Sequence, residues 1–435
     1  MGKVNVLVFP GAGYPAIEIC TYLKHSMRFH VIAASSYPNH SEFVCTETIT
    51  DLPFITDPTF FDAFNNLLQQ RNISYVIPTD ETSAMLLSKE QANLSATIVS
   101  SPYETALLCR HKKLTYERLA GKPYLPRVYS VPAEVSAYPV FVKPDDGQGG
   151  RGAQIIKSPT DFCGVAELSR MVICEYLPGE EYTVDCFTRG DGKLLFCNPR
   201  IRARIMNGIT ARGQNVPCTE EFLTIVRDLN NEIKFHGYWF VQLKRDTLGA
   251  LKLMEICTRF AGSFGISQAL GVNLPLMALC DFAGLPCEAI ANRYKVICDK
   301  TYIDRYFLDI PYDHVYIDYD DTVTAENGTR VNAYILAFLY QCRAKDIRVT
   351  LLTRHTDTYQ EPLADSMQRL SLCPTLFQEI VELTWRETKT EHIAASEGSI
   401  FIDNSFSERK AIAENCHIPV FDVDNIDCLF DWREP

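Results

Sequence analysis

Apolar positions in the first hundred residues fall into short continuous runs separated by a segment with helical spacing. Val4–Phe9, His30–Ala34 and Tyr75–Pro78 are largely apolar along their whole length. In Ala16–Leu23, by contrast, the apolar positions recur on one helical face. Continuous apolar strands that alternate with helices are typical of a parallel sheet covered on both faces. We therefore expect an α/β domain over residues 1–105.

A glycine-rich loop follows the next apolar strand. A helix that opens at His111 leads to the strand Phe141–Pro144, which delivers Lys143 into the loop Gly147–Gly152. Glycines allow backbone N–H groups to turn toward an anion, and Lys143 and Arg151 supply positive charge. The alternative is an ordinary hairpin turn. The spacing differs from that of a Walker loop or a dinucleotide fingerprint, so the loop predicts a nucleotide-phosphate site of another kind.

The bulk composition restricts the class of protein. A chain of 435 residues is too long for one hydrophobic core, so several domains are expected. The formal net charge of −12 disfavours a nucleic-acid-binding surface. The 16 cysteines are scattered, without zinc-site or disulfide-framework spacing, which indicates reduced thiols in the cytoplasm. We expect no signal peptide after Met1, and no apolar run is long enough to span a membrane.

Five motifs occur in an order that is specific as a set: a helix lysine (Lys112 or Lys113), a strand lysine (Lys143), the segment Glu175-Tyr176-Leu177 with Gly179-x-Glu181 after it, Gln242, and Glu255-Ile256-x-x-Arg259. They resemble the ATP-grasp superfamily over about residues 1–290, most closely the carbamoyl-phosphate-synthase-like ligases. The resemblance implies a Rossmann-like domain over residues 1–105, followed by an α+β ATP-grasp domain over residues 106–297.

The resemblance implies a role for each motif residue in binding ATP and Mg²⁺, which prefers hard oxygen ligands. One position departs from the family pattern, because Cys257 stands where Asn is usual, and a neutral thiol is a poor Mg²⁺ ligand. We therefore expect weaker binding of the second metal. The implied roles are phosphate contacts for Lys112 (or Lys113) and Lys143, a lid over the triphosphate for Gly149 and Gly150, adenine contacts for Glu175, Tyr176 and Leu177, a ribose contact for Glu181, Mg²⁺ ligation for Gln242 and Glu255, and stabilisation of the transferred phosphoryl group for Arg259.

Three arginines lie between these motifs. Arg200, Arg202 and Arg204 alternate with Ile201 and Ala203, so strand geometry places all three on one face. Three like charges in register repel one another unless an anion lies between them. One interpretation is an ordinary solvated strand face. We favour a binding site for a carboxylate or phosphate of the second substrate.

The hydrophobic pattern restarts after a loose connector at residues 298–312. A buried strand then delivers Asp318 and Asp320, whose i, i+2 spacing places two carboxylates on the same side. Carboxylates so close repel unless a cation lies between them or one is protonated. The other polar residues of this pattern are Thr353 and Asp403, each at the end of an apolar strand, and Lys389, at the start of a helix expected over Thr390–Ala395.

This order resembles the haloacid-dehalogenase (HAD) phosphatase superfamily over residues 313–435, with all four of its motifs present. The resemblance implies that Asp318 is the nucleophile and that Asp320 is the general acid and then the base. Relatives without hydrolysis often replace the second aspartate, so Asp320 indicates a phosphatase, although the run from Asp403 also has features of glyceryl-transfer domains. The remaining implied roles are phosphoryl contacts for Thr353 and Lys389, and an Mg²⁺ site made by Asp318, Asp403 and the backbone carbonyl of Asp320.

The spacing between these motifs leaves little room for a cap. Thirty residues separate Thr322 from Thr353, and thirty-five separate Thr353 from Lys389. Each gap is mostly used by a helix and its connections. We expect a capless HAD-like Rossmannoid domain with an open site. That site either accepts a bulky phosphoester or uses the ATP-grasp part or a second subunit as its lid, which leaves a homo-oligomer open.

Together the two resemblances predict a cytoplasmic bifunctional enzyme. The ATP-grasp part would be an ADP-forming carboxylate–amine ligase that works through an acyl-phosphate. The HAD part would be an Mg²⁺-dependent phosphomonoesterase acting on a substrate or product of the same pathway. ATP and Mg²⁺ are the expected cofactors, and a small-molecule carboxylate, an amine and a phosphoester are the expected partners. Two alternatives remain: an ATP-grasp kinase joined to the phosphatase, and a nucleotide-binding regulatory protein with one inactive half.

Overall fold

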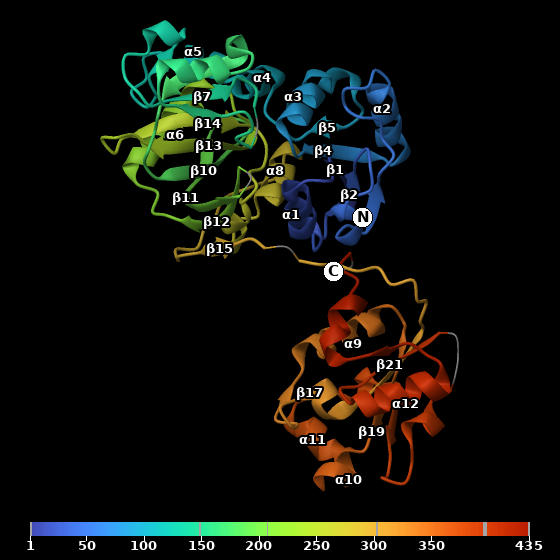
Figure 1. The fold of residues 1–435 in the computed structure, drawn as a ribbon. Coiled ribbons are helices and arrows are strands. Elements are labelled where there is room, and N and C mark those ends of the chain that lie inside the picture. Colours follow the sequence, from blue (N-terminus) through green and yellow to red (C-terminus); the bar gives the residue numbers. More distant parts are fainter. Residues whose placement is uncertain (1, 148, 207, 302, 395–397, 434–435) are drawn as a thin grey trace. The chain divides into compact units, whose positions relative to one another are not determined.

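The chain divides into two compact units, which are described separately (Figure 1). The first comprises Met1–Tyr302 and Arg433–Pro435, and the second comprises Ile303–Trp432. The division falls within the connector expected at residues 298–312. The computed structural model describes residues 2–147, 149–206, 208–301, 303–394 and 398–433.

The first unit begins with a parallel sheet of strand order β3-β2-β1-β4-β5. Alternate residues of β1 enter different cores, because Val6 and Val8 pack with helix α1 whereas Leu7 and Phe9 pack with helix α2. The two-sided burial expected from continuous apolar strands is therefore confirmed. The bounds are β1 (Val4–Phe9), α1 (Tyr14–Leu23), β2 (Phe29–Ala34), β3 (Glu47–Ile49), α2 (Phe60–Gln70), β4 (Ile73–Pro78), α3 (Glu81–Lys89), β5 (Thr97–Ile98) and α4 (Tyr103–Arg110).

A small antiparallel sheet of order β6-β9-β7-β8 comes next in the first unit. It follows helix α5 (Lys112–Arg118), whose first residue is one of the predicted phosphate contacts. Strand β7 carries Lys143, as the sequence pattern predicts. The strands are β6 (Val128–Tyr129), β7 (Val140–Pro144), β8 (Gln154–Ile156) and β9 (Met171–Glu175).

A larger antiparallel sheet, of order β14-β13-β10-β11-β12-β15, completes the first unit. Fully buried Trp239 packs there with the apolar face of helix α6. Strand β15 extends the sheet into the expected connector, because Cys298 pairs with Gly213 of β12. The bounds are β10 (Glu181–Thr188), β11 (Leu194–Met206), β12 (Ile209–Asn215), α6 (Glu220–Glu232), β13 (Gly237–Arg245), β14 (Leu251–Cys257), α7 (Gly265–Ala269), α8 (Leu274–Phe282) and β15 (Ile297–Asp299).

The second unit is a parallel sheet of order β20-β19-β16-β21-β22. Phe338 and Leu339 of α9 pack with Ile317 on one face, and Ile412 of α12 packs with Phe401 on the other. The bounds are β16 (His314–Ile317), β17 (Thr324–Ala325), β18 (Arg330–Val331), α9 (Ala333–Ala344), β19 (Arg348–Thr353), α10 (His355–Tyr359), α11 (Leu363–Arg369), β20 (Glu379–Glu382), β21 (Ser399–Ile402), α12 (Phe406–Cys416) and β22 (Val420–Phe421).

The helix expected at Thr390–Ala395 is wrong over its described part. Lys389–His392 form a single 3₁₀ turn instead. Ile393 is buried in the core with Phe401, so the chain leaves the turn to place that side chain inward. The last residue of the expected helix lies outside the described residues. Across the described parts of both units, no helix is both long and apolar enough to cross a membrane.

Candidate active sites

The two predicted phosphate lysines of the first unit approach strand β14 from different elements. Lys112 begins α5, and its Nζ donates hydrogen bonds to the carbonyl oxygens of Gly147 (3.0 Å) and Asp145 (3.3 Å). Lys143 Nζ donates to the Tyr116 hydroxyl (2.9 Å) and to the carbonyl oxygen of Met254 (2.7 Å). Both side chains are buried, so their charges are held in fixed places.

The choice between Lys112 and Lys113 has a geometric basis. Lys112 Nζ lies 3.6 Å from the Glu255 carboxylate, one of the predicted Mg²⁺ ligands. Lys113 Nζ instead donates to the carbonyl oxygen of Ser169 (2.7 Å) at an exposed position. The structure therefore places Lys112, and not its neighbour, beside the glycine-rich loop and β14.

The predicted Mg²⁺ ligands Gln242 and Glu255 face each other across β13 and β14, where they are paired in register. An amide and a carboxylate oxygen are hard donors that suit Mg²⁺, which is commonly held by one or two carboxylates together with substrate phosphates. Among the residues that the structure describes, no three carboxylate, imidazole or thiol groups are arranged to hold a metal ion. The donor set therefore fits Mg²⁺ when phosphate oxygens complete it.

The glycine-rich loop has the backbone conformation that requires glycine. Gly149 and Gly150 have φ angles of 61° and 71°, which side-chain-bearing residues rarely adopt. A Cβ atom at Gly147 would lie 2.9 Å from the Pro144 side chain. The loop thus depends on glycine for its path beside β7.

The predicted ribose contact Glu181 is held by two cations. Arg202 forms an ion pair with it, and Lys244 Nζ lies 3.5 Å away. Arg202 also donates to Gln242 Oε1 (2.9 Å), so one arginine links the predicted ribose and metal residues. Glu175, a predicted adenine contact, accepts a hydrogen bond from the backbone N–H of Arg127 (3.0 Å). Tyr176 and Leu177 follow it directly, between β9 and β10.

The prediction of an external anion among the three arginines is wrong for Arg200. Its guanidinium makes two 2.7 Å hydrogen bonds to the carboxylate of Asp185, and the side chains are 1% and 0% exposed. Register shifts in β11 separate Arg202 from Arg204, and Arg204 pairs at the surface with Asp299 (2.8 Å). For Arg200 and Arg204, carboxylates of the protein itself therefore compensate the positive charges for which the sequence pattern predicted an external anion.

Arg259 is positioned by a residue that sequence reasoning missed. Glu81, at the start of α3, lies 3.1 Å from Arg259 and 3.1 Å from Arg110. The Cys257 thiol also lies 3.4 Å from the Glu81 carboxylate, and burial raises the pKa of this thiol well above its usual value. Cys257 therefore remains a neutral donor to Glu81. The available signal was an acid three residues beyond the end of a largely buried strand, β4.

A groove of about 1030 Å³ also lies in the first unit, bordered by α5, β6 and β9. Glu175 and Lys113 line it, but Lys112, Lys143 and Glu255 do not belong to its described lining. The groove adjoins the cluster of buried lysines, because Tyr116, which accepts a hydrogen bond from Lys143, also lines it.

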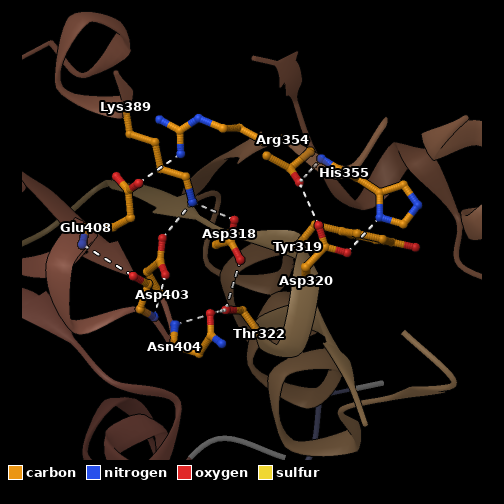
Figure 2. Close-up of polar contacts among 12 residues, drawn as sticks. Asp318, Tyr319, Asp320, Thr322, Arg354, His355, Lys389, Asp403, Asn404 and Glu408 are labelled. Atoms are coloured by element: carbon orange, nitrogen blue, oxygen red, sulfur yellow. Dashed lines mark hydrogen bonds and ion pairs between the residues drawn. The ribbon is translucent and has the colours of Figure 1, made fainter. Parts of the chain in front are cut away.

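The second unit brings its predicted residues together at the carboxyl ends of parallel strands. Lys389 Nζ lies between the carboxylates of Asp318 (2.5 Å) and Asp403 (2.6 Å), as Figure 2 shows. Asp318 follows β16 and Asp403 follows β21, which are neighbours in the sheet. All three side chains are almost fully buried. Loop residues from two strands and a turn thus form one compact charged cluster.

The charge of this cluster is unbalanced. Burial raises the pKa of Asp403 to about 7, with a further contribution from the Asp318 carboxylate, although Lys389 acts in the opposite direction. Burial likewise raises the pKa of Asp318 despite the same lysine. Burial alone would lower the pKa of Lys389, but the two carboxylates raise it. One ammonium does not compensate two buried carboxylates, so their oxygen donors fit an additional cation such as Mg²⁺.

Asp320 differs from Asp318 in its partners. The strand ends at Ile317, and Asp321 has a left-handed φ of 51°, so the two aspartates lie in a tight turn and not along a strand. Asp320 accepts a hydrogen bond from Thr353 Oγ1 (3.4 Å) and lies 2.6 Å from His355 Nδ1. Burial raises the pKa of Asp320, which favours a protonated carboxyl. This environment suits a proton donor.

Several residues around this cluster were not predicted. Buried His355 holds Asp320, and Thr322 Oγ1 donates to Asp318 (3.3 Å). Arg354 forms a 2.8 Å ion pair with Glu408, visible in Figure 2. These residues lie one to five positions after a motif residue, and that position was the only signal the sequence offered for them.

Comparison with known proteins identifies the fold of the first unit. The family model described as ATP-grasp in the biosynthetic pathway with Ter operon matches residues 167–300. No curated protein sequence matches the chain. Solved structures do match. A biotin carboxylase from Campylobacter jejuni, in complex with β,γ-ATP, has a TM-score of 0.55 and 14% identity, covering 68% of this chain and 75% of that one.

Two further structures agree with this. N5-carboxyaminoimidazole synthetase from Staphylococcus aureus, complexed with ADP, has a TM-score of 0.54 and 18% identity, covering 66% of this chain and 79% of that one. An L-amino acid ligase from Bacillus licheniformis has a TM-score of 0.51 and 16% identity, covering 64% and 73%. At such identities the likeness concerns the fold alone. The chain contains an ATP-grasp fold.

Proposed function

We propose that this chain is a bifunctional enzyme, an ADP-forming carboxylate–amine ligase joined to an Mg²⁺-dependent phosphatase of the HAD type. The observation that carries the proposal is that each unit holds its own cluster of charged residues built around buried lysines. Lys112, Lys143 and Glu255 form the first cluster, and Asp318 and Lys389 belong to the second. The joining of the two units suggests consecutive steps of one small-molecule pathway.

In the ligase, the charged groups would favour reaction at the terminal phosphate of ATP. Lys112 and Lys143 would hold the α- and β-phosphates, while Arg259, fixed by Glu81, would stabilise charge on the γ-phosphoryl group. A substrate carboxylate would attack the γ-phosphorus, forming an acyl-phosphate and releasing ADP. An amine would then displace phosphate to form the amide. Mg²⁺, held by Gln242 and Glu255, would supply neutralisation of phosphate charge.

The names of the structural neighbours agree with this class of reaction. One is an L-amino acid ligase, and another is a carboxylase bound to an ATP analogue. We infer the same use of ATP here. The pairing of Arg202 with Glu181 and Gln242 leaves Arg202 at the border of the nucleotide and metal residues, where it would orient both. Arg204, which is exposed, is the remaining candidate for a contact to the second substrate.

In the phosphatase, Asp318 would attack the phosphorus atom of a phosphomonoester. The bond to the leaving oxygen would break as Asp320 donates its proton to that oxygen. Asp320 would then accept a proton from the water that hydrolyses the aspartyl-phosphate, which releases inorganic phosphate and restores Asp318. Lys389 and Thr353 would hold the phosphoryl oxygens. Mg²⁺, held by Asp318, Asp403 and the Asp320 carbonyl, would supply neutralisation of the phosphoryl charge.

The experiment that tests the ligase combines metabolite profiling with nucleotide analysis. Profiles of cells with and without the protein would identify an accumulated carboxylate or phosphoester and a missing amide. Those compounds are then incubated with ATP, Mg²⁺ and the Asp318→Asn variant, which removes phosphate release by the second unit. ADP together with the amide is the expected result. AMP and pyrophosphate would overturn the acyl-phosphate route.

The phosphatase is tested by phosphate release from the phosphoester that accumulates. The full chain with Mg²⁺ should release phosphate, and chelation with EDTA should stop the release. Release that continues without a divalent cation would contradict the assignment of Asp318, Asp403 and the Asp320 carbonyl as metal ligands.

A further inference from the structure

Three exposed aromatic side chains lie in the segments that follow the carboxyl ends of strands in the second unit. Tyr359, Trp385 and Phe406 are 39%, 67% and 72% exposed, and we call them the aromatic rim. They follow strands β19, β20 and β21 in turn, so they lie on both sides of β16, from which Asp318 emerges. Single exposed aromatics are ordinary on protein surfaces. Three at the sheet edge where parallel α/β folds bind ligands form a recognisable group.

Trp385 is tied to the phosphatase residues by Arg354, which directly follows Thr353. The Arg354 guanidinium lies over the indole at 5.8 Å from the ring centre. It also donates hydrogen bonds to Glu408 and to the carbonyl oxygen of Glu387, both at 2.8 Å. The guanidinium therefore supports one face of the indole, while the large exposed fraction leaves area for another ring to stack.

The other two rim residues are also connected to the proposed catalytic cluster. The Tyr359 ring packs against the His355 ring, with centres 5.3 Å apart, and His355 holds Asp320. Phe406 is the first residue of α12 and follows Ser405, whose backbone N–H donates to Asp403 (2.7 Å). Tyr359 therefore touches the residue that holds Asp320, and Phe406 follows in sequence the residue that donates to Asp403.

We propose that the aromatic rim binds a planar aromatic ring in the leaving group of the phosphomonoester. This inference rests on the proposed phosphatase function. With the phosphate held by Lys389 and Thr353 and the leaving oxygen beside Asp320, the rest of the ester would leave the cluster at the carboxyl edge of the sheet, where the rim residues follow β19, β20 and β21. Because Glu408 neutralises Arg354, the rim offers ring faces at this point and not a free cation. A ring therefore suits it better than a second phosphate.

A pair of esters isolates this effect. 2-Phenylethyl phosphate and 2-cyclohexylethyl phosphate have leaving alcohols of similar size and acidity but differ in the planarity and π-system of the ring. The full chain with Mg²⁺ should hydrolyse the phenyl ester with a kcat/KM roughly two- to tenfold higher, as expected for one favourable aromatic pair. Trp385→Leu and Phe406→Leu should each bring the ratio toward one.

The matched control is Tyr340→Leu on α9. Tyr340 is also exposed, but it lies in the second half of α9, which leads to the amino-terminal edge of β19. This variant should keep the full preference for the phenyl ester.

Equal kcat/KM values for the two esters in the unaltered protein, or a preference that survives both rim substitutions, would overturn the inference and leave the phosphatase function standing. Absence of phosphate release from both esters and from the phosphoester that accumulates in cells without the protein would overturn the phosphatase function and the inference with it.

Discussion

The two candidate sites prepare for phosphate in opposite ways. In the first unit, Lys143 contacts neutral groups, a phenol and a carbonyl, so its positive charge remains available for an anion. In the second unit, Lys389 is shared between Asp318 and Asp403, so negative charge is in excess. The first arrangement suits a polyphosphate directly. The second suits phosphate only when a divalent cation is present.

The backbone origin of the two sites also differs. In the second unit, the charged residues follow the ends of parallel strands, which meet at one edge of the sheet. In the first unit, they come from a helix start, two antiparallel sheets and the start of α3. The second site is thus assembled by one simple topology, whereas the first depends on packing between several elements.

The largest effect should come from removing the proposed nucleophile. Asp318→Asn keeps the size of the side chain but lacks the carboxylate that would attack phosphorus, so phosphate release should fall at least about a thousandfold. Binding of Mg-ATP, measured by calorimetry on the same protein, should remain unchanged because it belongs to the other unit. Loss of both properties in a folded variant would show that the two sites are not independent.

The next largest effect concerns stability. Arg200→Ala leaves the Asp185 carboxylate buried without its cation, which should cost about 3–5 kcal/mol of unfolding free energy. Arg204→Ala removes only a surface ion pair with Asp299 and should change that free energy by less than about 0.5 kcal/mol. Denaturant titration of both variants gives the comparison. Similar losses for the two arginines would contradict the assignment of Arg200 as a structural residue.

A smaller effect is expected at the phosphate lysines. Lys143→Ala removes a charge-assisted contact to ATP and should weaken Mg-ATP binding by roughly ten- to a hundredfold. The matched control is Lys113→Ala, because Lys113 is only half-buried and its Nζ donates to the Ser169 carbonyl oxygen, away from the cluster. That variant should bind ATP normally. Calorimetry measures ATP binding by the first unit, and phosphate release reports on the second unit. Neither lysine substitution should slow phosphate release.

Much of the second site could be predicted because its residues are local to strand ends. Asp318, Thr353 and Asp403 each close a continuous apolar run, and such runs are readable without knowledge of tertiary packing. His355 could not be predicted in the same way, since its burial against Asp320 depends on how α10 packs. The error at Thr390–Ala395 has the same origin, because burial of Ile393 outweighs local helix preference.

The arginine strand shows the limit of reasoning from spacing. Alternation correctly indicated that the charges of Arg200, Arg202 and Arg204 need compensation. It could not identify the compensating groups, because Asp185 lies on the neighbouring strand and Asp299 lies far along the chain on β15. Glu81 was missed for a similar reason, since it reaches Arg259 from α3 across 178 positions of sequence.

The smallest expected effect concerns Mg²⁺ binding at the first site. Cys257 is a neutral, buried thiol that donates to Glu81, so it offers no oxygen to Mg²⁺. Cys257→Asn adds an amide oxygen two residues beyond Glu255 and should lower the Mg²⁺ concentration needed for half-maximal ADP formation by a few fold. Cys257→Ala removes the thiol without adding an oxygen and should give no such gain. The assay belongs in the Asp318→Asn background, because phosphate and metal use by the second unit would otherwise overlap. An equal Mg²⁺ requirement for both variants would mean that the residue at 257 packs against Glu81 and takes no part in metal binding. The difference between the two sites would then rest on charge balance alone.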